Sequence, residues 1–106
     1  MKKVSIIIVT YNSEKDIYEC INSIIENSDI PLTEIELVVV DNNSTGCDTM
    51  FGKLKTLWGE DIILIKNSSN GGYGQGNNVG IRRCSAPLVL IMNPDVRLVC
   101  PIFHKA

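Results

Sequence analysis

The chain has 106 residues, a formal net charge of −2, and a composition of 44% hydrophobic and 21% charged residues. This length fits one domain, and the composition is that of a globular protein, which excludes intrinsic disorder. The small negative charge provides neither the basic footprint of a nucleic-acid-binding protein nor a polybasic membrane segment, so we expect no nucleic-acid partner.

The cysteines are too scattered to indicate a metal centre. None has C-x-x-C spacing, and His104 is the only histidine. No apolar run approaches the roughly 18 residues of a membrane span, and the apolar start lacks a small-residue cleavage site. We therefore expect reduced, structural thiols and a cytoplasmic protein, with peripheral attachment to the inner face of the membrane left open.

Val4–Thr10 is a continuous β-branched apolar run, which predicts a strand buried on both faces of a parallel sheet. Asn12 or Ser13 can cap the helix that follows. Apolar residues recur in this helix at i, i+3, i+4, i+7 and i+8, so one face should pack on the sheet: Ile17, Cys20, Ile21, Ile24 and Ile25. A loop interrupted by Pro31 ends this first unit.

The alternation of strand and helix continues to the end of the chain. The pattern predicts strands over residues 35–41, 62–66 and 88–92, and helices over residues 48–58 and from about residue 74. We expect the last strand to be a buried core strand, because it belongs to the apolar run of residues 87–92. This order predicts an α/β fold with an open, mostly parallel sheet and helices on both faces.

An open sheet of four strands leaves edges that need a partner. Residues 96–100 could form an extra edge strand, a second copy of the chain could pair with the uncovered edge to give a homo-oligomer, or the chain could be part of a longer protein. We favour the third alternative.

Polar residues or glycines follow every predicted strand. These four groups are Thr10–Asn12, Asp41–Ser44, the segment 67–78 and Asn93–Asp95. Parallel strands end at one edge of the sheet, and open α/β sheets bind ligands there. The groups should therefore converge on one site.

Asp95 is well placed for a metal ion, because Mg²⁺ or Mn²⁺ is commonly held by one or two carboxylates together with substrate phosphates. Asp41 could hydrogen-bond a base or ribose, or it could cap the following loop. The segment 70–76 contains four glycines in seven residues. Such backbone can approach a phosphate closely, although a flexible surface loop is the alternative. Neither a dinucleotide fingerprint after the first strand nor a Walker loop occurs, which argues against hydride transfer and ATP hydrolysis.

Together these segments resemble the family 2 glycosyltransferases, which have the GT-A fold, a Rossmann-like fold that binds nucleotide-diphosphosugars. The resemblance rests on four motifs in the family's order: Val4–Asn12, Val38–Ser44, Asn70–Gly80 and Leu90–Asp95. Asn93-Pro94-Asp95 is similar to the rhamnosyltransferase-like branch, whereas the family commonly has Asp-X-Asp at this point.

The resemblance implies a nucleotide-sugar site formed by Thr10, Tyr11, Asn12, Asp41, Asn43, Asn70, Gly71, Asn77, Asn93 and Asp95. Thr10 and Tyr11 would shape the base and ribose site, and Asp41 would hydrogen-bond a uracil or thymine base. Asn70 and Asn77 would form the wall near the diphosphate. Asp95 would bind the Mg²⁺ or Mn²⁺ ion that stabilises the departing nucleoside diphosphate.

The implied activity is inverting transfer of a sugar from a UDP- or dTDP-sugar to a hydroxyl of a saccharide or lipid-linked acceptor, as in polysaccharide biosynthesis. Family members use an Asp or Glu base from an acceptor-binding half. No Asp or Glu follows Asp95, so we expect that base beyond Ala106 and residues 1–106 to be the donor-binding part of a truncated domain. The alternative is a non-catalytic nucleotide-binding or scaffold module with the same fold.

Overall fold

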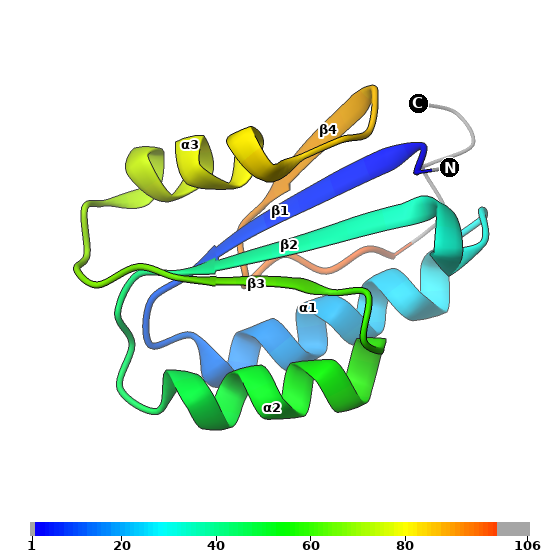
Figure 1. Cartoon of the computed structure of the whole chain (residues 1–106). Helices are drawn as coiled ribbons and strands as arrows, with labels where there is room; N and C mark the ends of the chain where they lie inside the picture. Colours follow the sequence, from blue (N-terminus) through cyan, green and yellow to red (C-terminus); the bar gives the residue numbers. More distant parts are fainter. Residues whose placement is uncertain (1, 100–106) are drawn as a thin grey trace.

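The computed structural model describes residues 2–99, which form a four-stranded sheet with helices on both faces (Figure 1). All strands run parallel, in the spatial order β3-β2-β1-β4. The strands are β1 (Val4–Thr10), β2 (Ile35–Asp41), β3 (Ile63–Lys66) and β4 (Leu88–Met92). The helices are α1 (Glu14–Asn27), α2 (Cys47–Trp58) and α3 (Tyr73–Arg83), with a short 3₁₀ turn η1 (Leu32–Glu34) before β2. The predicted fold class is confirmed, and η1 was not predicted.

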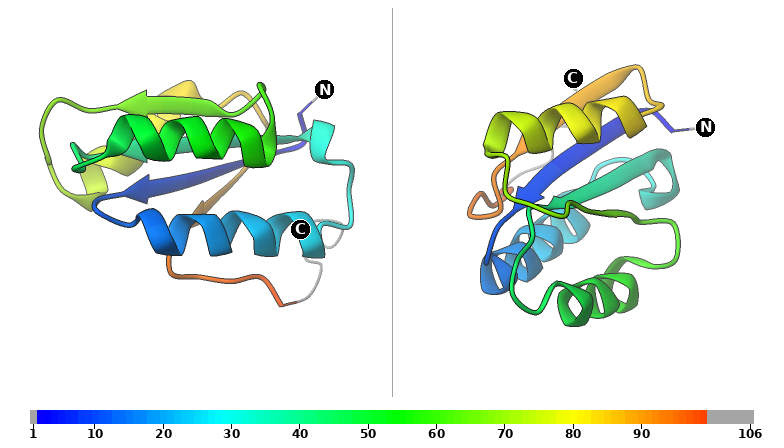
Figure 2. Two further views of the ribbon diagram at one scale, coloured as in Figure 1. Left: turned by 90° about the horizontal axis from the view of Figure 1, so that it is seen from below. Right: turned by 60° about the vertical axis from the view of Figure 1, so that its left-hand side comes forward.

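The core has two parts because the two faces of the sheet are covered by different helices (Figure 2). Helices α1 and α2 pack on one face, where Ile6, Ile8, Leu37 and Val39 meet the apolar stripe predicted for α1. Helix α3 packs on the other face, against Ile7, Val9, Val38 and Val40. Side chains alternate along a strand, so β1 and β2 are buried over their whole length, as their unbroken apolar sequences predicted.

The prediction that β4 is buried is wrong for three of its five residues. Leu88, Val89 and Ile91 are 38%, 39% and 42% exposed. Strand β4 lies at the edge of the sheet, and α3 lies over β1 and β2 and leaves β4 uncovered (Figure 1). Only Leu90 and Met92 pack against the core on the α1 side. Apolar composition alone did not distinguish an edge strand from a central one.

The alternative of an extra edge strand is contradicted over residues 96–99, which adopt no regular structure. This segment runs instead along α1. The side-chain amide of Asn27 donates to the backbone oxygen of Leu98 at 2.9 Å, and the Leu98 N–H donates to Ser23 Oγ at 3.0 Å. The backbone of Leu98 therefore bonds to side chains of α1 and not to a neighbouring strand.

The described cysteines, Cys20, Cys47 and Cys84, are free thiols, in agreement with the prediction. Cys100 and His104 lie outside the described residues. Over residues 2–99, no helix is both long enough and apolar enough to cross a membrane.

Glu36 is a carboxylate in β2 that is only 7% exposed. It accepts hydrogen bonds of 2.8 Å from Ser5 Oγ in β1 and from both the N–H and the Oγ of Ser85. Burial raises the pKa of Glu36, but the bonds from Ser85 and Ser5 and the charge of Lys2 outweigh it, so the net pKa is lowered. This network joins the two central strands to the loop before β4 and thereby fixes where β4 starts.

Glu36→Gln should destabilise the fold at neutral pH but not in acid. Because the pKa of Glu36 is lowered by folding, its carboxylate stabilises the folded state at pH values above its ordinary pKa of 4.5. This contribution is lost as the pH falls through the folded-state pKa. Urea unfolding followed by circular dichroism at pH 7 and at about pH 3 measures it. Glu60→Gln, at an exposed position, is the matched control. A Glu36→Gln effect of equal size at both pH values would contradict this account.

Two glycines let α3 lie close to the sheet. A Cβ atom at Gly76 would lie 2.6 Å from Val9 Cγ1, and one at Gly80 would lie 2.6 Å from Ile7 Cγ2. Both contacts are with side chains of buried β1 residues, which have little room to move in a close-packed core. Only glycine fits these two positions without displacing the helix.

Gly80→Ala should lower the free energy of unfolding by about 1–3 kcal/mol, the usual cost of overpacking a core. Gly52→Ala in α2 is the control, because a Cβ atom there meets nothing within 4 Å. That substitution should stabilise the protein by up to about 1 kcal/mol through helix propensity. Urea unfolding measures both variants, and a neutral Gly80→Ala would show that α3 is less closely packed than described.

Candidate functional site

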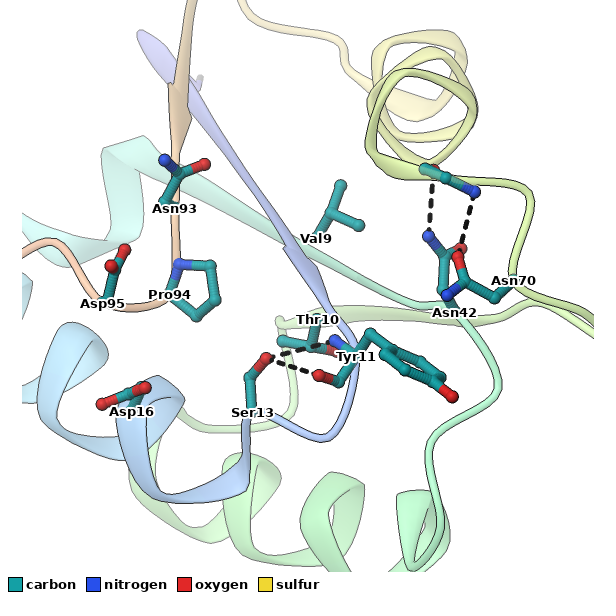
Figure 3. A pocket seen from close by; sticks show the side chains of 11 residues that line it. Val9, Thr10, Tyr11, Ser13, Asp16, Asn42, Asn70, Asn93, Pro94 and Asp95 are labelled. Atoms are coloured by element: carbon teal, nitrogen blue, oxygen red, sulfur yellow. Dashed lines mark hydrogen bonds between the residues drawn. The ribbon is translucent and has the colours of Figure 1, made fainter.

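The carboxyl edge of the sheet holds a pocket of about 450 Å³ (Figure 3). This volume lies within the range of about 300–1,000 Å³ that is common for small-molecule sites. The pocket is lined by Val9, Thr10, Tyr11, Ser13, Asp16, Asn42, Asn70, Gly72, Asn93, Pro94 and Asp95. All four groups predicted from the ends of the strands contribute to it, so their predicted convergence is confirmed.

The two ends of the pocket differ chemically (Figure 3). One, the acidic end, is formed by Asp16 from α1 and by Asn93 and Asp95 after β4. The other, the amide end, is formed by Tyr11, Asn42, Asn70 and Gly72. The Tyr11 ring points toward the amide end and is 52% exposed. An elongated ligand with a charged part and a hydrogen-bonding aromatic part would match this division.

Arg97 fixes the acidic end. Its Nη1 donates to the backbone oxygen of Pro94 at 2.8 Å and to that of Val96 at 3.0 Å. Its Nη2 pairs with Asp16 at 3.3 Å and with Glu19 at 2.8 Å. The guanidinium thus joins the turn that contains Asp95 to the first turns of α1, and the Glu19 bond is the main reason that the pKa of Arg97 is raised.

The donor atoms at the acidic end suit a hard divalent cation, because Mg²⁺ and Mn²⁺ prefer carboxylate and amide oxygens. In residues 2–99 no group of three or more His, Cys, Asp or Glu side chains could hold a metal ion. A cation at Asp95 would therefore need further ligands, such as the oxygens of a bound diphosphate or water.

Asp41 lies behind the pocket wall and is completely buried. Its carboxylate accepts hydrogen bonds from Thr10 Oγ1 at 2.7 Å, from Ser44 N at 2.7 Å and from Ser44 Oγ at 2.6 Å. Burial raises the pKa of Asp41, but these bonds and one from Cys47 outweigh it and lower the net pKa. Of the two roles that the sequence left open, this geometry supports the loop cap.

Asn12 and Asn43 do not line the pocket but shape the loops beside it. Both have positive φ values, 50° and 64°, which asparagine tolerates better than most residues. The N–H of Asn12 donates to Ser44 Oγ at 2.7 Å, and Asn12 Oδ1 accepts from Thr45 N at 3.1 Å. These bonds hold the loop after β1 against the loop after β2.

In the glycine-rich segment, Asn70 and Gly72 line the pocket, whereas Gly71 and Asn77 do not. Asn70 Oδ1 accepts from the Gly72 N–H at 2.9 Å, and Gly72 has a φ of 93°, which favours glycine. Asn77 lies in α3, and its Oδ1 is buried with no hydrogen-bond partner in the described part of the chain. The segment is therefore partly pocket wall and partly helix.

Six lining residues were not among the ten site residues named from the sequence: Val9, Ser13, Asp16, Asn42, Gly72 and Pro94. Asn42 is the most informative, because it bonds to two other loops. Its Oδ1 accepts from Asn67 Nδ2 at 2.7 Å, and its Nδ2 donates to the Gly72 oxygen at 3.1 Å. The alternation of side chains in β2 could have identified it, since the position after Asp41 points to the opposite face.

Comparison with known proteins is consistent with this geometry. Residues 5–98 match the family described as Glycosyl transferase family 2. The poly(ribitol-phosphate) beta-N-acetylglucosaminyltransferase TarS of Staphylococcus aureus is 36% identical over 96 residues, which is 90% of this chain and 16% of TarS. The chain therefore spans about one sixth of the length of this curated relative.

Two solved structures have the same fold as this chain. S. aureus TarS 1-349 in complex with UDP-GlcNAc matches with a TM-score of 0.76 and 35% identity, over 88% of this chain and 26% of that one. The mannosyltransferase PcManGT of Pyrobaculum calidifontis, in complex with GDP-Man and Mn²⁺, matches with a TM-score of 0.78 and 28% identity, over 88% of this chain and 27% of that one. Because the family match covers most of the sequence, this chain belongs to glycosyl transferase family 2.

Proposed function

We propose that this chain is the donor-binding half of an inverting glycosyltransferase that takes a sugar from a UDP- or dTDP-sugar. The observation that supports this most directly is the division of the pocket into an acidic end and an amide end. A nucleotide-sugar has a similar division, with a hydrogen-bonding aromatic base at one end and, beyond the ribose, a charged diphosphate that carries the sugar.

The base would occupy the amide end. The exposed ring of Tyr11 offers a surface for stacking, and the amides of Asn42 and Asn70 offer hydrogen-bonding groups. TarS, whose solved complex contains UDP-GlcNAc, supports a uridine nucleotide. The Asn93-Pro94-Asp95 motif, through its similarity to the rhamnosyltransferase-like branch, is the reason to keep a dTDP-sugar beside it.

The diphosphate would lie at the acidic end, with Asp95 and Asn93 holding a Mg²⁺ or Mn²⁺ ion. Such an ion would act as a Lewis acid toward the leaving diphosphate. The Asp95 carboxylate would repel a diphosphate, and the charge of Arg97 is already shared by Asp16 and Glu19, so a cation at Asp95 would favour this placement. The Mn²⁺ in the PcManGT complex supports the proposal.

The contribution of this chain to transfer would be to bind and orient the donor. Arg97 would keep the Asp95 turn in register with α1 through its four hydrogen bonds. We propose that the base for the acceptor hydroxyl comes from a further part of the protein, since this chain spans only 16% of the length of TarS. The acceptor would be a saccharide or a lipid-linked glycan.

Isothermal titration calorimetry with UDP and dTDP, with and without Mn²⁺, tests the donor site. We expect at least one nucleotide to bind, and Mn²⁺ to strengthen that binding. Asp95→Ala should remove this gain, roughly tenfold in affinity or about 1.4 kcal/mol, and should not weaken binding without metal, because it removes a charge that repels the diphosphate. Asp61→Ala, at an exposed position outside the pocket, is the matched control and should behave as the parent.

Two results would contradict the proposal separately. Failure of the parent to bind either nucleotide would overturn the donor site. A full Mn²⁺ gain in Asp95→Ala would overturn only the assigned metal ligand.

A further inference from the structure

We propose that Asn67, which does not line the pocket, sets the base preference of the donor site by fixing the orientation of the Asn42 amide. The inference rests on the proposed function, because it takes the amide end as the base subsite. It concerns a positioning residue, which would act on the ligand through Asn42.

Asn67 is firmly held where β3 ends. Its backbone N–H donates to the backbone oxygen of Asp41 at 2.8 Å, which continues the pairing of β3 with β2 by one residue. Its side-chain nitrogen donates to Asn42 Oδ1 at 2.7 Å. In a side-chain amide only the nitrogen donates and only the oxygen accepts. In the observed pair Asn67 donates, so the Asn42 oxygen faces β3.

A second partner enforces the same orientation. Asn42 Nδ2 donates to the Gly72 backbone oxygen at 3.1 Å, and a carbonyl oxygen can only accept. Asn42 is 2% exposed, so water cannot readily replace either partner. A turn of the amide by 180° would break both hydrogen bonds and would place like groups against each other on both sides.

This orientation determines what the pocket presents to a ligand. Gly72 and Asn42 both line the pocket, and the Asn42 nitrogen is the atom that bonds to Gly72, so we take this nitrogen as the atom nearer the ligand. The Asn70 oxygen is likewise engaged, by the Gly72 N–H at 2.9 Å. The amide end therefore presents N–H donors. If the 4-position of a pyrimidine lies there, the keto oxygen of uracil or thymine would accept a hydrogen bond, whereas the 4-amino group of cytosine would meet another donor.

UDP and CDP form the matched pair of ligands, because they share the ribose and diphosphate and differ at the pyrimidine edge. Calorimetric titration of the 106-residue chain with each gives the ratio of their dissociation constants. We expect the parent to bind UDP about tenfold more tightly than CDP. With CDP, the hydrogen bond from the protein N–H to the keto oxygen is lost, and two N–H donors face each other instead.

Asn67→Asp should reverse or abolish this preference. A carboxylate accepts but does not donate, so the Asn42 amide should turn its nitrogen toward position 67 and its oxygen toward the pocket. Asn67→Ala removes one of the two restraints without adding charge and leaves the bond to Gly72, so it should lower the UDP-to-CDP ratio by less than Asn67→Asp does. Asn78→Asp adds the same charge at an exposed position in α3 and should keep the parental ratio. Thermal melting followed by circular dichroism verifies that each variant folds, and Asn67→Ala provides the test if Asn67→Asp does not fold.

The outcomes separate this inference from the proposed function. If the parent binds neither nucleotide, the donor site itself is overturned and this inference with it. If the parent binds UDP and CDP equally, or if folded Asn67→Asp or Asn67→Ala retains the parental ratio, the role of Asn67 is overturned while the donor site stands.

Discussion

The buried carboxylate of Asp41 joins the ends of the two central strands. It accepts from Thr10, the last residue of β1, and twice from Ser44 in the loop after β2. Ser44 in turn accepts from the backbone of Asn12. Loops after parallel strands have no ladder to hold them, so their position depends on side-chain bonds of this kind. Without this carboxylate, the loops on both sides of the pocket mouth would lose their common anchor.

A buried charge of this type is tolerated only when hydrogen bonds replace water. Asp41 meets that condition with three hydrogen bonds from Thr10 and Ser44, and Glu36 meets it at the other end of the same strand with Ser5 and Ser85. Strand β2 therefore has a satisfied carboxylate near each end. One fixes the loops at the pocket, and the other fixes the loop that leads into β4 and so, indirectly, the turn that contains Asp95.

The fold was predictable because apolar runs and the alternation of strands and helices can be recognised in the sequence. Much of the site depends instead on individual side-chain hydrogen bonds, which these patterns do not indicate. Unbroken apolar runs such as Val4–Thr10 identified central strands, and the alternation of elements identified the parallel sheet. The same rule failed for β4, since an apolar sequence does not reveal that a strand lies at the edge of the sheet or that no helix covers one of its faces. At the end of β2 the charged residue was expected to face the ligand. Burial of Asp41 and the place of Asn42 in the pocket lining follow instead from side-chain alternation and from the bonds of Ser44 and Asn67.

The close packing of Gly76 and Gly80 against β1 gives the glycine-rich segment a meaning opposite to the usual one. Glycine often indicates mobility, but these two residues remove the space in which α3 could move. The helix packs closely on the sheet. Gly72 directly precedes its first turn and accepts a hydrogen bond from the Asn42 amide. The pocket wall is therefore preorganised before any ligand arrives. A ligand then loses little of its binding free energy to the conformational entropy of loop ordering, which favours discrimination by hydrogen bonds over induced fit.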